Sequence, residues 1–426
     1  MVSKVILPYA KSQIELEVDS VNLAGILVPP EIHKTYACDQ ESLVQKALEN
    51  PIGTKRLCSL AQGKQNVVII TSDHTRAVPS KITLPLLLAE IRKGNPTAKI
   101  TVLIATGLHR GMTKDEMTDR FGSDLVSKEN FVNHNAYDKS LFKELGTLPS
   151  GSKCEINKIV CNADLVVAEG FIEPHFFAGF SGGRKSIFPG TASQACVNIN
   201  HSAKAIAHPN SITGVLDGNP IHNDMLTAAK MAKLAFILNV LLNEKKEIVD
   251  AYCGDTDLAH RAGCTQLLSQ AGVEPIKADI VITTNGGYPL DQNLYQCPKG
   301  LSSALMCAKK GAVIILVAAC EDGLGGENFE KMMQEGSPQE LLDRILNTPP
   351  EKTISEQWCV QRFAEALIHY RIILVSSLKE SLVKAMGFLY APTVENALQQ
   401  AYAIKGQTAQ VTIIPDGVSV IVKEKK

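Results

Sequence analysis

Two hydrophobic patterns alternate along the first part of the chain. Short, continuous apolar runs rich in β-branched residues occur at 67–71, 100–105, 165–169 and 236–241. Such runs are typical of strands that are covered on both faces. The segments 81–93 and 224–233 instead have the spacing of amphipathic helices. This alternation predicts an α/β fold with a mainly parallel sheet flanked by helices.

A second series of the same kind begins after residue 272. Its strands are expected at 279–284, 313–318 and 372–376, and its helices at 301–309 and 357–367. A chain of 426 residues is also longer than one packed core usually serves. We therefore predict two α/β domains, 1–272 and 273–426, with the active site in the cleft between them. The last strand and turn, about 406–426, is compatible with either domain.

The N-terminus and the overall charge exclude several classes of protein. Residues 1–18 alternate between polar and apolar side chains, which predicts a first strand instead of a signal peptide and hence a cytoplasmic location. The apolar runs are too short to cross a membrane. The 43 Lys and Arg balance 44 Asp and Glu, so no global field favours nucleic acid or a membrane surface. The eleven cysteines include no C-x-x-C pair, which argues against a disulfide framework or a usual zinc site.

Polar clusters follow several of the predicted strands. SDHTR at 72–76, TGLHR at 106–110, EPH at 173–175 and NGGYPLDQN at 285–293 each come a few residues after an apolar run. In open α/β sheets, ligands bind beyond the carboxyl ends of the strands. We therefore expect these four clusters, from both domains, to meet in the interdomain cleft.

The glycine-rich segment GFSGGRKS at 179–186 is similar to a phosphate-binding loop but departs from it. Arg184 stands where the glycine before the lysine should be, and the segment does not leave its strand directly. A nucleoside triphosphate loop is thus disfavoured. Its glycines still allow backbone N–H groups to approach an anion, and Lys185 is able to bind or covalently engage a cofactor. The alternative is a flexible turn with a surface lysine.

Three histidines and two cations are candidates for chemistry. His109 and His175, facing a substrate from opposite sides, would suit a reaction run in both stereochemical senses. His201 fits a metal ligand, although a lone histidine is more often structural. Arg76 and Lys299, one from each half of the chain, are candidates for binding a carboxylate.

Two further residues have open interpretations. Asp73 could orient a neighbouring histidine or bind a hydroxyl, and the alternative is an exposed ion pair with Arg76. Trp358 is the only tryptophan and lies near the start of a predicted helix, where it would belong either to the core or to a pocket wall.

Taken together, these motifs resemble the nickel-dependent lactate racemase family. The resemblance extends over essentially the whole chain and rests on SDHTR at 72–76, ATGLHR at 105–110, EGFIEPHFFAGFSGGRKS at 169–186, the NH pair at 200–201 and TNGGYPLDQNLYQ at 284–296. It implies a racemase that interconverts L- and D-lactate by hydride transfer from the α-carbon. It also implies a nickel-pincer nucleotide, in which two sulfur-containing arms and a ring carbon hold nickel.

The resemblance assigns roles to individual residues. His109 and His175 correspond to the alternating acid/base pair, Lys185 to the lysine joined to the cofactor, and His201 to the protein ligand of nickel. The cofactor-contacting segment corresponds to Asp73, His74, Thr75 and Arg76. The substrate positions correspond to Arg76, Tyr295, Gln296, Lys299 and Trp358. The expected partners are a small 2-hydroxy acid and the proteins that make and deliver the cofactor, with neither nucleic acid nor membrane.

Other functions remain open at this point. The same cofactor could serve a racemase or epimerase of another 2-hydroxy acid. A nicotinamide-dependent 2-hydroxy acid dehydrogenase shares the hydride chemistry, although no G-x-G-x-x-G opens a helix after the first strand. A phosphate-handling enzyme and a two-domain protein that only binds small acids are the remaining alternatives.

Overall fold

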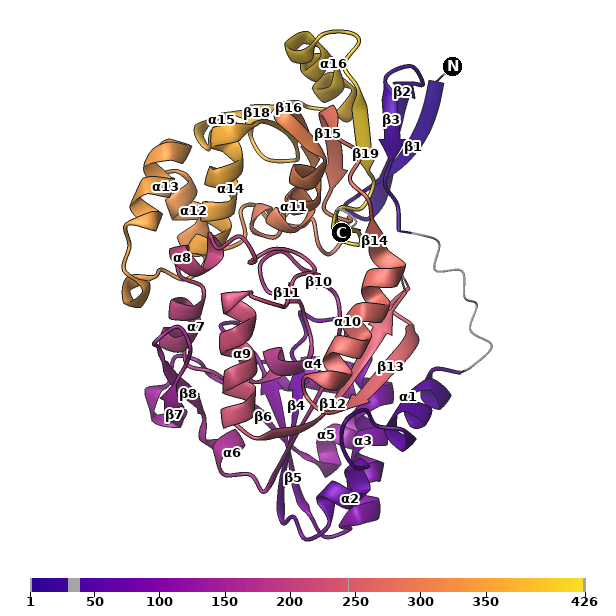
Figure 1. Cartoon of the computed structure of the whole chain (residues 1–426), viewed down its shortest axis with the longest axis vertical. Helices are drawn as coiled ribbons and strands as arrows, with labels where there is room; N and C mark the ends of the chain where they lie inside the picture. The colour runs from indigo at the N-terminus through magenta and orange to yellow at the C-terminus, as the bar shows by residue number, and fades with distance from the viewer. Residues whose placement is uncertain (1, 30–38, 244, 424–426) are drawn as a thin grey trace.

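The computed structural model describes residues 2–29, 39–243 and 245–423, and it has two α/β lobes (Figure 1). Each lobe is built on a six-stranded sheet. The strand orders are β13-β12-β9-β4-β5-β6 and β18-β17-β16-β15-β19-β3. The predicted α/β fold with mainly parallel sheets and flanking helices is confirmed.

The N-terminal sheet contains the four strands expected from continuous apolar runs. Its strands are β4 (Asn66–Ser72), β5 (Lys99–Ala105), β6 (Asn130–Asn133), β9 (Leu165–Phe171), β12 (Leu234–Leu242) and β13 (Ile248–Gly254). All pair in parallel except β13, which runs antiparallel to β12. The longer helices of this lobe are α1 (Gln40–Glu49), α3 (Ser80–Gly94), α4 (Lys114–Phe121), α9 (Pro220–Met231) and α10 (Leu258–Ala271). The carboxyl ends of β4, β5 and β9 carry three of the predicted polar clusters.

The C-terminal sheet is parallel throughout. Its strands are β15 (Ala278–Thr284), β16 (Ala308–Val317), β17 (Arg371–Val375), β18 (Leu389–Tyr390), β19 (Val411–Ile414) and β3 (Leu23–Ile26). Its longer helices are α11 (Pro298–Cys307), α13 (Pro338–Leu346), α14 (Gln357–His369) and α16 (Val394–Lys405). Helix α11 follows the loop after β15, and this loop carries the fourth polar cluster.

The first residues form two strands, so the expectation of a single strand over 1–18 is wrong. β1 (Val2–Tyr9) and β2 (Ser12–Asp19) pair as an antiparallel hairpin whose turn includes Ala10, with φ of 47°. The inward-facing Val5 and Leu7 pack on the C-terminal sheet, where they share a hydrophobic cluster with Ile282 of β15. Hydrogen bonds of 2.8 Å from the Ala10 N–H to Asp291 Oδ2 and from the Tyr288 N–H to the Ala10 carbonyl fix the turn to the loop after β15.

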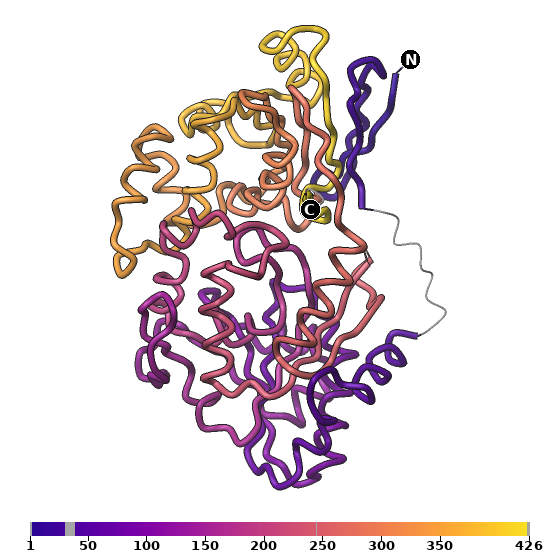
Figure 2. The backbone as a smooth tube through the Cα atoms, in the orientation of Figure 1, coloured from indigo at the N-terminus to yellow at the C-terminus, as the bar shows by residue number. Residues whose placement is uncertain are grey.

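The two ends of the chain meet in the C-terminal lobe. Strand β3 pairs with β19, so the indigo hairpin and the yellow C-terminal strand stand side by side in Figure 2. A short final strand, β20 (Ile421–Val422), pairs with β14 (Gly272–Val273), where the chain enters this lobe. The limits 1–272 and 273–426 stay a prediction. The strand pairings add that residues 23–26 belong to the C-terminal sheet.

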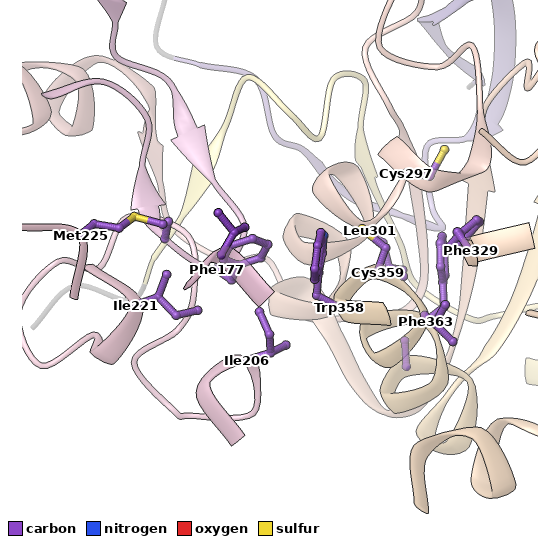
Figure 3. Packing of buried hydrophobic residues seen from close by; sticks show 14 of the residues in the cluster. Phe177, Ile206, Ile221, Met225, Cys297, Leu301, Phe329, Trp358, Cys359 and Phe363 are labelled. Atoms are coloured by element: carbon purple, nitrogen blue, oxygen red, sulfur yellow. The ribbon is translucent and has the colours of Figure 1, made fainter. Parts of the chain in front are cut away.

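One hydrophobic cluster continues from lobe to lobe. Phe177 and Ile206 belong to its N-terminal side and Leu301 and Phe363 to its C-terminal side, with Trp358 standing between them (Figure 3). The lobes are therefore packed together through apolar contacts near the predicted site. Among the described residues, no helix is long and apolar enough to span a membrane, and the cysteines are free thiols.

Candidate active site

The first predicted base, His109, is paired with a buried carboxylate. His109 Nδ1 lies 2.8 Å from Oδ2 of Asp73, which follows β4 directly. The His109 side chain is 43% exposed, whereas that of Asp73 is 2% exposed. Thr75 donates to Asp73 Oδ1 through its N–H at 2.9 Å and its hydroxyl at 2.6 Å. Asp73 therefore orients the ring of His109, and the alternative of an exposed Asp73–Arg76 ion pair is wrong.

The ionisation of Asp73 follows from these contacts. Burial alone would raise the pKa of this carboxyl group, since it disfavours the charged form. The hydrogen bond and charge of His109, with the Thr75 hydroxyl and the charge of Arg76, together outweigh burial and lower the pKa of Asp73 to about 2. The carboxylate is thus ionised at neutral pH and able to hold the imidazole in one orientation.

The second predicted base, His175, has a different environment. It lies on β10 (Pro174–His175), which pairs with β11 (Gly179–Phe180) between the two lobes (Figure 1). The Ala178 N–H donates to His175 Nδ1 at 3.3 Å, which leaves Nε2 for the proton of the neutral ring. Phe176 stacks on the ring at 5.3 Å between centroids. Burial holds the pKa of His175 well below its usual range, and the charges of Lys185, Lys299, His201 and Arg76 add to this effect.

Phe177 brings three of the predicted site residues together. Its ring meets those of His175 and His201 edge to face, with centroids 4.5 Å and 4.9 Å apart. The Lys185 Nζ lies 5.9 Å from the centroid of the same ring. An acid/base candidate, the candidate tether and the candidate metal ligand thus surround one buried phenylalanine.

The loop of Lys185 is anchored, so it is not the flexible surface turn considered from the sequence. Asn239 Oδ1 accepts the Gly183 N–H at 2.7 Å, and a Cβ at Gly182 would come within 2.8 Å of the same oxygen. The buried Arg184 donates to the Ala178 carbonyl at 2.8 Å. Burial, then the charges of Arg184 and Arg76, hold the pKa of Lys185 well below its usual range. The segment ends in a four-residue 3₁₀ turn, Gly183–Ser186, where a phosphate-binding loop would open a longer helix.

Backbone hydrogen bonds connect the loop of His109 to that of Lys185. The Gly107 N–H donates to the Gly190 carbonyl at 3.1 Å, and the Gly190 N–H donates to the Lys185 carbonyl at 3.1 Å. Gly107 adopts a left-handed conformation, with φ of 54°, in the turn that leads to His109. The polar cluster that follows β5 and the segment that carries Lys185 are therefore held against each other.

His201 is buried and neutral, as a histidine ligand of a metal needs to be. It ends α7 (Gln194–Asn200), is 5% exposed, and its ring meets that of Trp358 at 4.9 Å. Its Nδ1 is buried without a hydrogen-bond partner among the described residues. Burial and the charge of Lys185 lower the pKa of His201 to about 3, so the ring is neutral at physiological pH. A neutral imidazole is the form that binds metals.

The C-terminal lobe supplies the opposite wall. Tyr295 lies in the 3₁₀ turn Leu294–Gln296, Lys299 in the first turn of α11, and Trp358 in the first turn of α14. Trp358 Nε1 donates to the Tyr295 hydroxyl at 3.1 Å. Trp358 belongs to the core, since it is 6% exposed and contacts His201 and Tyr295, and its part in a pocket wall stays a prediction.

Arg76 and Lys299 bring positive charge to this region from the two lobes. The charge of Arg76 acts on Asp73, His175, Lys185 and Lys299, so this exposed side chain connects the surroundings of the two histidines. Burial lowers the pKa of Lys299, opposed first by the charge of Glu173. The positive charge of Arg76 and Lys299 favours an anionic ligand.

Some residues deviate from the sequence-based expectation. Glu173 was not singled out, although its charge acts on both Lys185 and Lys299; its place directly before Pro174 and His175 was the available signal. His74 and Gln296 make none of the ring contacts or side-chain hydrogen bonds given above. The Nδ1 of His74 is buried without a partner among the described residues. Across the described residues, no group of three or more His, Cys, Asp or Glu could hold a metal ion.

Comparison with known proteins decides the family. A model described as the lactate racemase N-terminal domain matches residues 9–214, and one described as the lactate racemase C-terminal domain matches residues 273–422. A lactate racemase from Thermoanaerobacterium thermosaccharolyticum is 50% identical over 421 residues, covering 98% of this chain and 99% of the relative. The chain belongs to the lactate racemase family. A second member, from Lactiplantibacillus plantarum, is 48% identical over 419 residues, with the same coverage of 98% and 99%.

Solved structures agree with this membership of the lactate racemase family. The lactate racemase apoprotein from T. thermosaccharolyticum matches with a TM-score of 0.96 at 50% identity, covering 99% of this chain and 100% of that chain. A Thermotoga maritima protein matches with a TM-score of 0.67 at 19% identity, covering 90% and 98%, which shows a shared fold alone. The protein is accordingly an enzyme of the isomerase class, a racemase.

Proposed function

We propose that this racemase interconverts L- and D-lactate with a nickel-pincer nucleotide, using His109 and His175 as alternating acid and base. The observation that supports the proposal is that the charge of Arg76 acts both on Asp73, the partner of His109, and on His175. His109 is held by Asp73. His175, Lys185 and His201 surround Phe177, and the charge of Arg76 acts on His175.

The residues present fit such a cofactor. His201 offers a neutral ring whose buried Nδ1 lacks a partner among the described residues. Lys185 has a lowered pKa, which favours the neutral amine needed to form a covalent bond. Because the described residues provide no cluster of metal ligands, a metal at His201 would need most of its ligands from an organic group. A pincer nucleotide meets this requirement, since its own sulfur and carbon atoms hold nickel.

The substrate would be held by its carboxylate. Arg76 and Lys299 are cations from opposite lobes, and an arginine fork matches a carboxylate in two places. Tyr295 and Trp358, joined by their hydrogen bond, would form an aromatic wall of the substrate site. A wall of this kind accommodates the methyl group of lactate, whereas larger 2-hydroxy acids would need more room.

The chemistry explains why two bases are needed. The hydrogen on the α-carbon of lactate is a poor acid because the adjacent carboxylate already carries negative charge. The nickel-pincer nucleotide would supply an acceptor that takes this hydrogen as a hydride and gives it back. One histidine accepts the hydroxyl proton, which leaves a flat 2-keto acid held by Arg76 and Lys299. The other histidine would donate a proton to the carbonyl oxygen of the 2-keto acid on its opposite side, and the product would be the other enantiomer.

Substrate labelled with deuterium at the α-carbon tests this proposal. A hydride that stays out of contact with water should return, so D-lactate made from α-deuterated L-lactate in ordinary water should keep its deuterium. Mass spectrometry of the product measures this directly. Loss of the label to solvent would contradict the proposal and indicate α-proton removal. A lactate-dependent rise in NADH absorbance would instead identify the dehydrogenase, and binding without conversion would identify a small-acid binding protein.

The substrate and the cofactor have separate tests. Racemisation of lactate, malate and an aromatic 2-hydroxy acid should be compared side by side, and we expect lactate to be converted fastest. Protein produced together with the cofactor-synthesis and delivery proteins should show an increased intact mass and bound nickel, and Lys185→Ala should lose the mass increment. Protein produced without these partners should show neither.

A further inference from the structure

The interface between the lobes contains one arginine that bridges them through the backbone. Arg362, in α14, donates from Nη2 to the carbonyls of Ile206 and Ser211, both at 2.7 Å. Its Nη1 donates to Glu365 at 2.9 Å within the same helix. Ile206 ends α8 (Ala203–Ile206), so the two accepting carbonyls belong to the N-terminal lobe and the donor to the C-terminal lobe.

Other contacts follow the same interface. The neighbouring Gln361 donates to the Ala203 carbonyl at 3.0 Å. Asn198, in α7, donates to the Thr353 carbonyl at 3.0 Å and accepts from the Ser355 hydroxyl at 3.1 Å. All these bonds join residues 198–211 of one lobe to residues 353–362 of the other. Arg362 is the charged member of this set, and its bonds to two carbonyls are the shortest.

This interface holds Trp358 against His201, the candidate metal ligand. Trp358 precedes Arg362 by one turn of α14, and its ring meets that of His201 at 4.9 Å. Figure 3 shows Trp358 at the junction, with Ile206 on one side and Leu301 on the other. Because α7 carries His201 and α14 carries Trp358, the spacing of these rings depends on how α14 is held on the segment 206–211.

We infer that Arg362 is a positioning residue that clamps α14 to the N-terminal lobe and so fixes Trp358 against His201. It contacts neither substrate nor cofactor positions itself. The inference goes beyond the proposed function, since the clamp acts on the protein whether or not a cofactor is attached.

Trp358 is the only tryptophan in the chain, so its fluorescence reports on this contact alone. In the wild-type protein the 6% exposed ring should emit at short wavelength and be poorly quenched by acrylamide. In Arg362→Met the quenching constant should rise severalfold and the emission should shift to longer wavelength, measured well below the unfolding temperature. Arg362→Met removes both cross-lobe hydrogen bonds, and because the loss of even one charge-assisted bond changes an equilibrium about tenfold, kcat/KM for lactate should fall about tenfold or more in the loaded enzyme.

Arg344→Met is the matched control. Arg344 lies in α13 of the same lobe and pairs with Glu335 at 2.8 Å, and it is 47% exposed. Its removal should leave the quenching of Trp358 at the wild-type value. Unchanged quenching in a folded Arg362→Met protein, or an equal increase in Arg344→Met, would overturn the inference. Should the Met variant fail to fold, Arg362→Gln retains a polar donor but cannot reach both carbonyls, and unchanged quenching in that variant would overturn it as well.

Discussion

The surroundings of His109 and of His175 differ in charge and in burial. The His109 side chain is 43% exposed and paired with an ionised carboxylate. His175 lies against two phenylalanine rings and among four positive or protonatable groups, and burial holds its pKa well below the usual range. In the unliganded protein, the neutral form of His175 is therefore favoured, whereas His109 has an ionised partner that orients its ring.

This difference bears on how a racemase treats two mirror-image substrates. The proposed reaction starts from one neutral and one protonated histidine, and the two exchange roles when the direction reverses. An anionic substrate bound between Arg76 and Lys299 would offset the cations around His175 and so raise its proton affinity.

Removing either imidazole should have the largest effect. His109→Ala and His175→Ala should each lower kcat about a hundredfold to ten-thousandfold in both directions, because general acid–base groups contribute this much. Polarimetry starting from L- and from D-lactate measures both directions. Thermal unfolding provides the control: both variants should remain folded, with some loss of stability in His109→Ala because the buried Asp73 loses its partner. A near-normal rate in either variant would show that the histidines are not a pair.

Replacing Asp73, the partner of His109, should impair the function of His109 and leave that of His175 unchanged. In Asp73→Asn the ring loses its fixed orientation, and kcat should fall about a hundredfold, as expected for a displaced catalytic group. Thr75→Val removes one hydroxyl donor to Asp73 and should cause a smaller loss. Steady-state kinetics should show the change in kcat with KM nearly constant. A fall confined to KM would mean that Asp73 binds substrate instead of orienting His109.

A change among the cations should affect substrate binding. Lys299→Met removes one of the two groups proposed to hold the carboxylate, and kcat/KM should fall about tenfold to a hundredfold, since hydrogen bonds to charged groups are worth this much. The control is Lys309→Met, because Lys309 is 46% exposed on β16 and pairs with Asp279. Equal losses in both variants would remove Lys299 from the substrate site.

Buried histidines outside the site should control stability at mildly acidic pH. Burial lowers the pKa of His134 to about 4, and burial with the charge of Arg184 lowers that of His222 to about 3. The unfolded chain binds their protons below about pH 6.5, so each reduces the free energy of unfolding by up to about 1.4 kcal/mol per pH unit as the pH falls toward the folded pKa. Urea unfolding between pH 6.5 and 4 should show that the free energy of unfolding depends less steeply on pH in His134→Gln than in the wild-type protein. An unchanged slope would contradict this account.

The fold was predictable where the apolar pattern of a buried strand was continuous. The buried runs of β4, β5 and β9 are covered on both faces, so their residues are apolar almost throughout and their positions could be expected to within about two residues. The N-terminal hairpin was missed because its turn at Ala10 lacks glycine, proline or asparagine. The four-residue strand β3 was missed because it is short and contains a glycine, and because only its pairing with β19 defines it.

The site was predictable from motifs more than from periodicity. Strand ends and the family resemblance indicated His109, His175, Lys185 and His201, and the structure brings the last three around Phe177. The cross-lobe bonds of Arg362 could not be expected, since backbone carbonyls accept them and leave no signal in the side chains of residues 206 and 211.

The half-reaction of each histidine variant tests the central claim most directly. In cofactor-loaded His109→Ala and His175→Ala, a single turnover with excess enzyme and a carbonyl trap should yield 2-keto acid from one enantiomer only. The account predicts opposite enantiomers for the two variants, because each remaining histidine accepts the proton from one hand of lactate. Oxidation of the same enantiomer by both variants would contradict it.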